Sequence, residues 1–152
     1  MATYRVSTFV AAPPERVFEA WTDPDRFIEW IGGVTRVTDR VGSAGQAGSS
    51  YTVWFGRMAS PTEVIEAERP RHIRSTFGNA ILKGESDVTF TPEGAGTRIQ
   101  QVFETRGLVA SVVGRVFAMG SYRGSFRGEL ETFRAMVERD SPGAGGPQAE
   151  GR

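Results

Sequence analysis

Residues that could do chemistry are few in this chain, and most of them fall on predicted strands between residues 61 and 105. The only histidine, His72, stands at the start of one such strand. A hydrolytic triad needs a histidine beside a nucleophile and a carboxylate. Nothing in the sequence places Ser75 or Asp87 in those roles. We therefore expect His72 to be an exposed residue at a strand end.

Four charged strand residues, Glu63, Glu66, Arg74 and Asp87, could act in a pocket if they pointed inward. Burial there would raise a carboxyl pKa and make the group a usable general acid or base. Side chains alternate along a strand, however, and the outer face of a half-buried sheet is polar. We expect these four on the outer face, where they could form cross-strand ion pairs.

Gln101 is the polar residue with the best claim to a place in a pocket. Its neighbours in phase on the strand, Ile99 and Phe103, are apolar, so its amide should point inward and need a partner. The alternative is a core glutamine that is hydrogen-bonded to a backbone carbonyl or to an ordered water.

Metal and cysteine chemistry are not expected. The chain has no cysteine and one histidine, which excludes thiolate nucleophiles and disulfides and makes a zinc or transition-metal site improbable. No cofactor is predicted. Acidic and basic residues balance at 18 each, so no basic surface for nucleic acid is expected.

Aromatic residues dominate the remaining candidates. The same residue types line a packed core and an apolar pocket, and only a void distinguishes the two. A phenol and a guanidinium on the last helix could orient a carbonyl or carboxylate at a pocket mouth, or could be an ordinary pair on the helix surface. The predicted ligand-binding residues are Trp54, Phe77, Phe90, Gln101, Phe103, Phe117, Tyr122 and Arg123.

These residues need a scaffold, and the periodicity predicts one. A strand over 4–11 ends at Pro13-Pro14, a helix follows to about Thr22, and a second short helix runs from Asp23-Pro24 to Gly32-Gly33. Short turns between the later strands favour an antiparallel meander. The six strands predicted after the helices cover 34–41, 49–57, 61–68, 71–78, 83–91 and 97–105.

A long helix is predicted over 108–139. Its C-terminal half carries Phe126, Leu130, Phe133 and Val137 at helical spacing, so this face should pack on the sheet. Its other half contains glycines that weaken a helix, which indicates either a kink near Gly120 or a frayed helix start, or else the close approach of another backbone or a partner chain. The line of glycines predicts weak dimerisation or a lid contact through Val113, Phe117 and Gly120, so we expect a monomer or a weak homodimer.

The two ends of the chain complete the expected organisation. The N-terminal residues resemble no secretory signal and no run approaches the ~20 apolar residues of a membrane span, so we expect a cytoplasmic protein. Residues 140–152 are small, polar and rich in proline and glycine, which predicts a disordered tail behind a single domain over 1–139.

The stretch APPERVFEAWTDPDRFIEW after the first strand, with six strands and a long helix behind it, resembles the START-like, pollen-allergen-like (SRPBCC) superfamily. The resemblance covers residues 3 to 139. Residues 45–107, with EVIEAERP and EGAGTRI, are similar to its polyketide cyclase/dehydrase-like branch, while the first helices also resemble the branch of heat-shock-chaperone ATPase activators.

The resemblance implies an α+β helix-grip fold, in which a seven-stranded antiparallel sheet wraps around the C-terminal helix and leaves a hydrophobic pocket between them. It implies shape more than reaction. We favour binding of a hydrophobic or amphipathic small molecule such as a lipid, polyketide or other aromatic or isoprenoid-type ligand. An aromatase/cyclase-like enzyme that uses the same pocket, and a chaperone-associated interaction module, are the alternatives.

Overall fold

The structure is a computed structural model, and it describes residues 2–78, 83–106 and 122–140. Seven strands and four helical segments are found in these ranges, and they follow the order predicted from the sequence. They are β1 Ala2–Val10, α1 Pro14–Thr22, the 3-10 turn η1 Pro24–Arg26, α2 Phe27–Trp30, β2 Arg36–Val41, β3 Ser50–Phe55, β4 Met58–Glu68, β5 His72–Gly78, β6 Lys83–Glu93, β7 Gly96–Arg106 and α4 Tyr122–Arg139.

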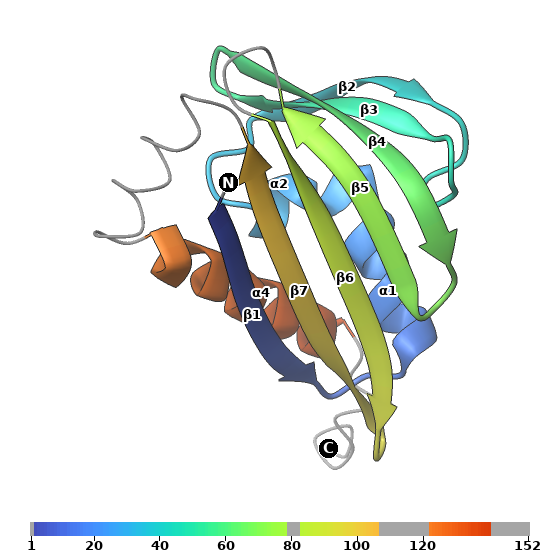
Figure 1. The fold of residues 1–152 in the computed structure, drawn as a ribbon. Coiled ribbons are helices and arrows are strands. Elements are labelled where there is room, and N and C mark those ends of the chain that lie inside the picture. Colours follow the sequence, from blue (N-terminus) through green and yellow to red (C-terminus); the bar gives the residue numbers. More distant parts are fainter. Residues whose placement is uncertain (1, 79–82, 107–121, 141–152) are drawn as a thin grey trace.

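All seven strands form one antiparallel sheet in the order β1-β7-β6-β5-β4-β3-β2. Neighbours from β2 to β7 are consecutive in sequence because short turns can join antiparallel strands. β1 instead pairs with β7, and the chain crosses behind the sheet through α1 and α2 before it starts β2 at the opposite edge (Figure 1). The sheet predicted from the sequence is confirmed.

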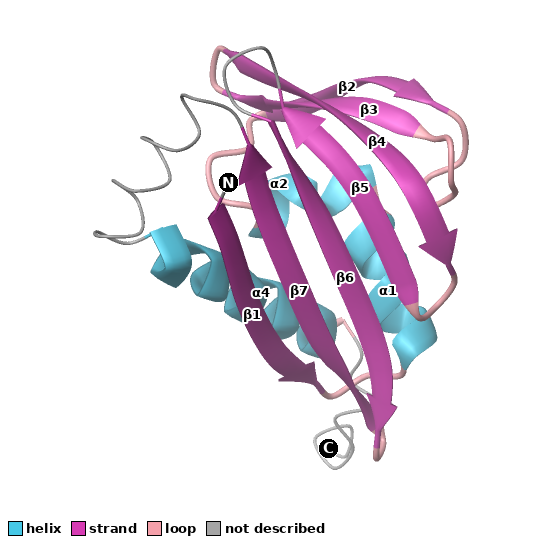
Figure 2. Cartoon of the chain, viewed as in Figure 1, coloured by secondary structure: helices cyan, strands magenta, loops and turns pink. Residues whose placement is uncertain are grey.

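The helices of the described residues lie on one face of the curved sheet, which we call the concave face; the outward face is the convex face (Figures 1 and 2). α1 begins at Pro14, where the missing N–H of proline is tolerated, and it buries Val17, Phe18 and Trp21. The side chain of Asp23 then caps η1 by accepting a hydrogen bond from the backbone N–H of Asp25 at 3.0 Å. The predicted pair of short helices is therefore present.

α4 packs on the sheet through the face that its apolar spacing predicted. Leu130, Phe133 and Val137 are buried, as is Met136. Two glutamates on this helix reach β1 and the residue after it: Glu131 Oε2 accepts from Thr8 Oγ1, and Glu138 Oε2 accepts from the backbone N–H of Ala11, both at 2.8 Å. Residues 108–121 of the predicted helix and residues 141–152 of the predicted tail lie outside the described residues. Within the described ranges, no helix is both long and apolar enough to cross a membrane.

Aromatic rings fill the space between α1, α2 and α4. Phe133 contacts Trp21 at 5.0 Å and Trp30 at 4.9 Å between ring centroids, and both contacts are edge-on. Phe18 makes a similar contact with Phe90 of the sheet at 5.4 Å. Edge-to-face pairs of this kind stabilise a core beyond their buried area. They fix α4 and α1 against one end of the sheet.

A buried hydrogen bond joins β7 to the turn before α1. Thr97 Oγ1 donates to the backbone carbonyl of Ala12 at 2.7 Å, and both residues are fully buried. We expect Thr97→Val to lower the free energy of unfolding by about 1–3 kcal/mol, because valine has the same shape but leaves that carbonyl without this donor. Urea unfolding measures the change. The matched variant Thr91→Val, at an exposed position of β6, should stay within about 0.5 kcal/mol of the parent; equal losses would contradict this account.

Candidate functional site

A cavity of about 390 Å³ lies between the concave face of the sheet and the three helices α1, α2 and α4. Strands β3 to β7 form its floor, while Trp21, Phe27, Trp30 and Ile31 contribute to its opposite wall. Gly32 and Met58 line the cavity and are also exposed, so the cavity reaches the surface beside them. Ligand pockets in proteins span about 300–1,000 Å³. The volume is sufficient for a small organic molecule.

The cavity exists because side chains on the floor become smaller toward one end of the sheet. Inward positions of β6 carry Phe90, Val88, Ser86 and Gly84 in succession. The Phe90 end is packed against Phe18 and Trp21. At the other end, hydroxyl-sized side chains leave room that the helices do not fill.

Polar groups are scattered over an otherwise apolar floor. Ser60, Thr62, Ser75 and Ser86 line the cavity, as does Gln101. Gln101 Nε2 donates to Ser86 Oγ at 3.1 Å across the β6–β7 pair. The predicted inward direction of Gln101 is confirmed, and its partner is a side chain of the floor rather than a backbone carbonyl.

Glu129 of α4 lines the cavity, although it was not among the site residues predicted from the sequence. Its Oε2 atom accepts a hydrogen bond from the backbone N–H of Gly32 at 3.0 Å. Burial raises the pKa of Glu129 to about 7, against the opposing effect of that hydrogen bond. The carboxyl can therefore hold or release a proton near neutral pH. A signal was available, because Glu129 precedes Phe133 by four residues and so lies on the same side of the helix.

Tyr51 of β3 supplies a phenol to the cavity floor. Its ring lies 5.4 Å from that of Phe27. Burial raises the pKa of Tyr51 above its ordinary value. The hydroxyl therefore stays protonated at physiological pH and can donate a hydrogen bond.

Phe77 and Phe103, which were predicted to bind ligand, line the cavity floor together with Gln101. The two rings are 4.8 Å apart between centroids. Phe77 also lies across Gly84, where an added Cβ would meet its ring. Ligand contact by these three residues remains a prediction.

Phe90 and Trp54 do not line the cavity, contrary to expectation. Phe90 is 1% exposed and lies in the packed core. Trp54 points to the convex face, because Val53 and Phe55 on either side of it take the inward positions of β3. There, Trp54 Nε1 donates to Thr38 Oγ1 at 2.9 Å, and the Arg36 guanidinium lies 4.4 Å from the indole ring.

Three predicted site residues cannot be placed. Phe117 lies outside the described residues, together with Val113 and Gly120 of the predicted dimer contact. Tyr122 and Arg123 belong to the first turn of α4, but their side chains lie outside the described part of the structure. Their roles at the pocket mouth remain predictions, as does the monomer or weak homodimer.

The charged strand residues lie on the convex face, as predicted. Arg74 pairs with Glu66 of β4 at 3.1 Å and with Glu85 of β6 at 3.7 Å. His72 is not simply an exposed strand end: its Nε2 lies 2.8 Å from Asp87 Oδ1, and its side chain is 27% exposed. These pairs are remote from the cavity floor, since they occupy the opposite face of the same strands.

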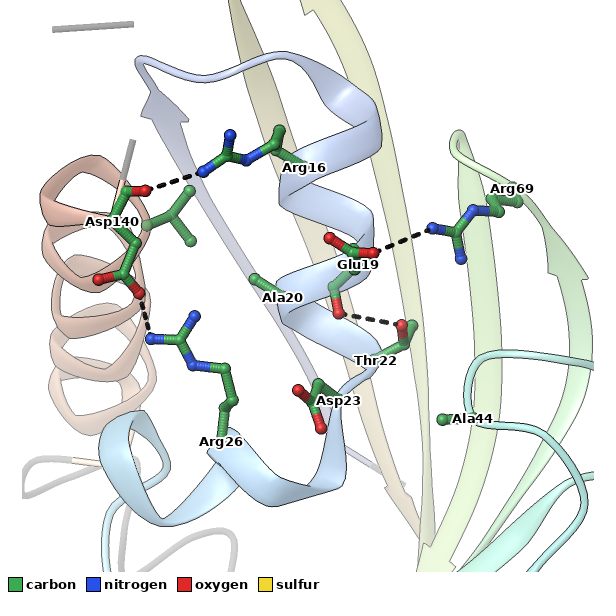
Figure 3. A pocket seen from close by; sticks show the side chains of 10 residues that line it. Arg16, Glu19, Ala20, Thr22, Asp23, Arg26, Ala44, Arg69 and Asp140 are labelled. Atoms are coloured by element: carbon green, nitrogen blue, oxygen red, sulfur yellow. Dashed lines mark hydrogen bonds and ion pairs between the residues drawn. The ribbon is translucent and has the colours of Figure 1, made fainter. Parts of the chain in front are cut away.

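A second hollow, of about 400 Å³, lies between α1, η1 and the end of α4, and Figure 3 shows it from close by. Its charged side chains are engaged with one another. Arg26 pairs with the Asp140 carboxylate, and Arg16 donates to the Asp140 carbonyl at 2.8 Å. Arg69 lies 4.0 Å from Glu19. Cations beside the C-terminal end of a helix interact favourably with its dipole, so the contacts of Arg16 and Arg26 with Asp140 help to hold the end of α4 against α1 and η1.

Comparison with protein families gives a match over nearly the whole described chain. A family model described as "Polyketide cyclase / dehydrase and lipid transport" matches residues 1–138. Among curated proteins, none matches this sequence.

Solved structures share the fold at low sequence identity. A Mesorhizobium loti protein has a TM-score of 0.72 and 18% identity over 91% of this chain and 98% of its own. A hypothetical protein from Helicobacter pylori gives 0.74 and 9%, over 90% and 88% respectively. DynU16, a protein of the dynemicin biosynthetic locus, gives 0.65 and 21%, over 90% of this chain and 47% of its own. Identities this low support the helix-grip fold alone.

Proposed function

Because this chain belongs to the polyketide cyclase/dehydrase and lipid transport family of the SRPBCC type, we propose that it binds a hydrophobic small molecule in the cavity between the sheet and α4. The observation that carries the proposal is the cavity itself, with about 390 Å³ of space where a domain of this size would otherwise pack side chains. At about 30 Å³ per water, that volume equals roughly a dozen waters.

The chemistry of the wall supports an aromatic occupant with a few polar groups. Trp21, Phe27, Phe55, Phe77 and Phe103 present aromatic surface to the cavity. Removing apolar ligand surface from water contributes about 25 cal/mol per Å². Hydroxyls of the floor and the amide of Gln101 can bond isolated oxygens of the ligand. A flat, hydroxylated ring system of the polyketide type suits such a wall.

The test is direct binding of a neutral aromatic probe, anthracenylmethanol, to the full chain. Fluorescence titration should show saturable binding with one site per chain and a dissociation constant in the micromolar range or below. Native mass spectrometry of freshly purified protein should also show a retained apolar compound. Unsaturable fluorescence, with no retained compound, would contradict the proposal.

A second candidate is an enzyme of the cyclase/dehydratase kind that uses the same cavity. Two titratable groups in the wall, Glu129 and Tyr51, favour it, because burial shifts the pKa of each. A carboxyl near pKa 7 suits general acid or base catalysis at neutral pH.

The third hypothesis is an interaction module, which would need a contiguous exposed apolar patch. Among the described residues, the exposed large apolar side chains are Ile28, Val41 and Met58. They belong to three different elements, so they do not by themselves support such a patch.

A further inference from the structure

The described side chains that line the cavity carry charge of one sign only, and that sign is negative. Among the described residues that line it, Glu129 is the one charged side chain, and none is arginine, lysine or histidine. A carboxylate that enters an apolar site needs a cation or several hydrogen-bond donors to offset its loss of hydration. A fatty acid would instead bring its negative charge into a cavity whose wall holds another one.

Glu129 has hydrogen-bonding capacity to spare. A carboxylate offers about four acceptor positions, and from the residues that the structure describes it receives one hydrogen bond, from Gly32 N–H. That bond holds Oε2 at Gly32, in the loop that follows α2. No other described residue occupies the remaining acceptor positions, so a group that enters the cavity can donate to them.

Among the side chains that the structure describes, none pairs with Glu129 to neutralise its charge. Arg26 and Glu29, on η1 and α2, pair with each other at 3.2 Å. On the β1 side, Thr8 bonds to Glu131. The strands of the floor present hydroxyls, Gln101 and apolar groups, and the Tyr51 phenol is protonated. Arg127, on α4 itself, is exposed.

We propose that the cavity selects a neutral or cationic aromatic ligand that donates an O–H or N–H hydrogen bond to Glu129, and that it disfavours a ligand whose carboxylate lies beside Glu129. Glu129 is then the residue that determines specificity by charge. This inference rests on the proposed function, since it names the class of molecule that the same cavity takes.

The selection depends on pH. Above about pH 7 the Glu129 carboxyl is ionised, so it attracts a cation and repels an anion. Below that pH it gains a proton, becomes a donor, and the penalty on a carboxylate ligand falls. By linkage, a carboxylate ligand should raise the pKa of Glu129, and an ammonium ligand should lower it.

The experiment compares three probes with one ring system and different charge: anthracenylmethylamine, anthracenylmethanol and anthracene carboxylate. Each is titrated by fluorescence into the parent and into Glu129→Gln at about pH 8, where Glu129 is charged. We expect Glu129→Gln to weaken the amine by about tenfold and to strengthen the carboxylate by about tenfold, with the alcohol changed by less than about threefold. Lowering the pH to about 5.5 should bring the parent toward the variant in its response to the carboxylate.

Glu138→Gln is the matched control, because Glu138 lies on the same helix, loses the same charge and also accepts one backbone N–H, from Ala11. It should leave all three affinities within about twofold. Glutamine at 129 keeps an acceptor for Gly32 N–H, and circular dichroism checks that the variant is folded. Shifts of the amine and carboxylate in the same direction, or equal shifts in Glu138→Gln, would overturn the inference alone. Failure of all three probes to bind the parent would overturn the proposed function and this inference together.

Discussion

Phe133→Ala is expected to lower the free energy of unfolding by about 3–5 kcal/mol, the cost of truncating a buried aromatic side chain. Phe133 is fully buried and holds Trp21 and Trp30 edge-on. Domains of this kind are stable by about 5–15 kcal/mol in total, so the loss is a large share. Urea or thermal unfolding followed by tryptophan fluorescence measures it.

The consequence for the site follows from the same contacts. Trp21 and Trp30 line the cavity as well as packing on Phe133, so a gap behind them lets both indoles tilt. We expect probe affinity to fall along with stability. Near-ultraviolet circular dichroism should show weakened tryptophan bands in the folded variant.

Phe9→Ala is the matched control, because it deletes the same atoms from a ring on the convex face. Phe9 is half-buried there, and the Arg98 guanidinium lies 5.6 Å from its ring. Its loss should cost roughly 1 kcal/mol and leave probe binding unchanged. If Phe9→Ala proved as costly as Phe133→Ala, the aromatic cluster under the helices would not be the main source of core stability.

Ser75→Phe is expected to weaken binding of anthracenylmethanol by at least about 100-fold, or about 2.7 kcal/mol. Ser75 lies at the centre of the cavity floor, directly opposite Ser86 of β6 and Val64 of β4. A phenyl group there occupies the space that the ligand needs. Because the ring enters an existing void, stability should change by no more than about 1 kcal/mol.

Thr76→Phe provides the control, since Thr76 is the next residue of β5 and points to the convex face. It adds a similar ring outside the cavity and should leave the dissociation constant within about twofold. Fluorescence titration of both variants and of the parent with anthracenylmethanol measures the three dissociation constants. Full binding by Ser75→Phe would show that the ligand site lies elsewhere.

One end of the sheet is tightly packed, and the other end lines the cavity. At one end, Phe90 contacts Phe18 of α1 and the neighbouring Ile99 is fully buried, so this end supplies stability. At the other end, Ser75, Ser86 and Gly84 leave space, and Phe77 lies across the glycine. A packed end can support an unfilled end because burial of apolar surface at one place offsets the contacts missing at the other.

Local sequence patterns were sufficient for the elements and for their order. Proline pairs, capping residues and apolar spacing marked α1, η1, α2 and α4, because these signals depend on neighbours within about four residues. Short turns implied the antiparallel meander. The alternation of β7 was also sufficient to predict that Gln101 points inward, since Ile99 and Phe103 lie on the same face of the strand.

Tertiary structure alone decided which residues surround the cavity. Val53, Trp54 and Phe55 of β3 are apolar or aromatic at three consecutive positions, so alternation did not show whether Trp54 or its two neighbours point inward. Glu129 is polar on a helix edge, and only the approach of Gly32, 97 residues away, makes it part of the wall. A cavity is a property of surfaces that meet from distant segments, and its emptiness depends on the fit between them. That fit is set by how α4 and α2 lie over the sheet, which no local pattern encodes.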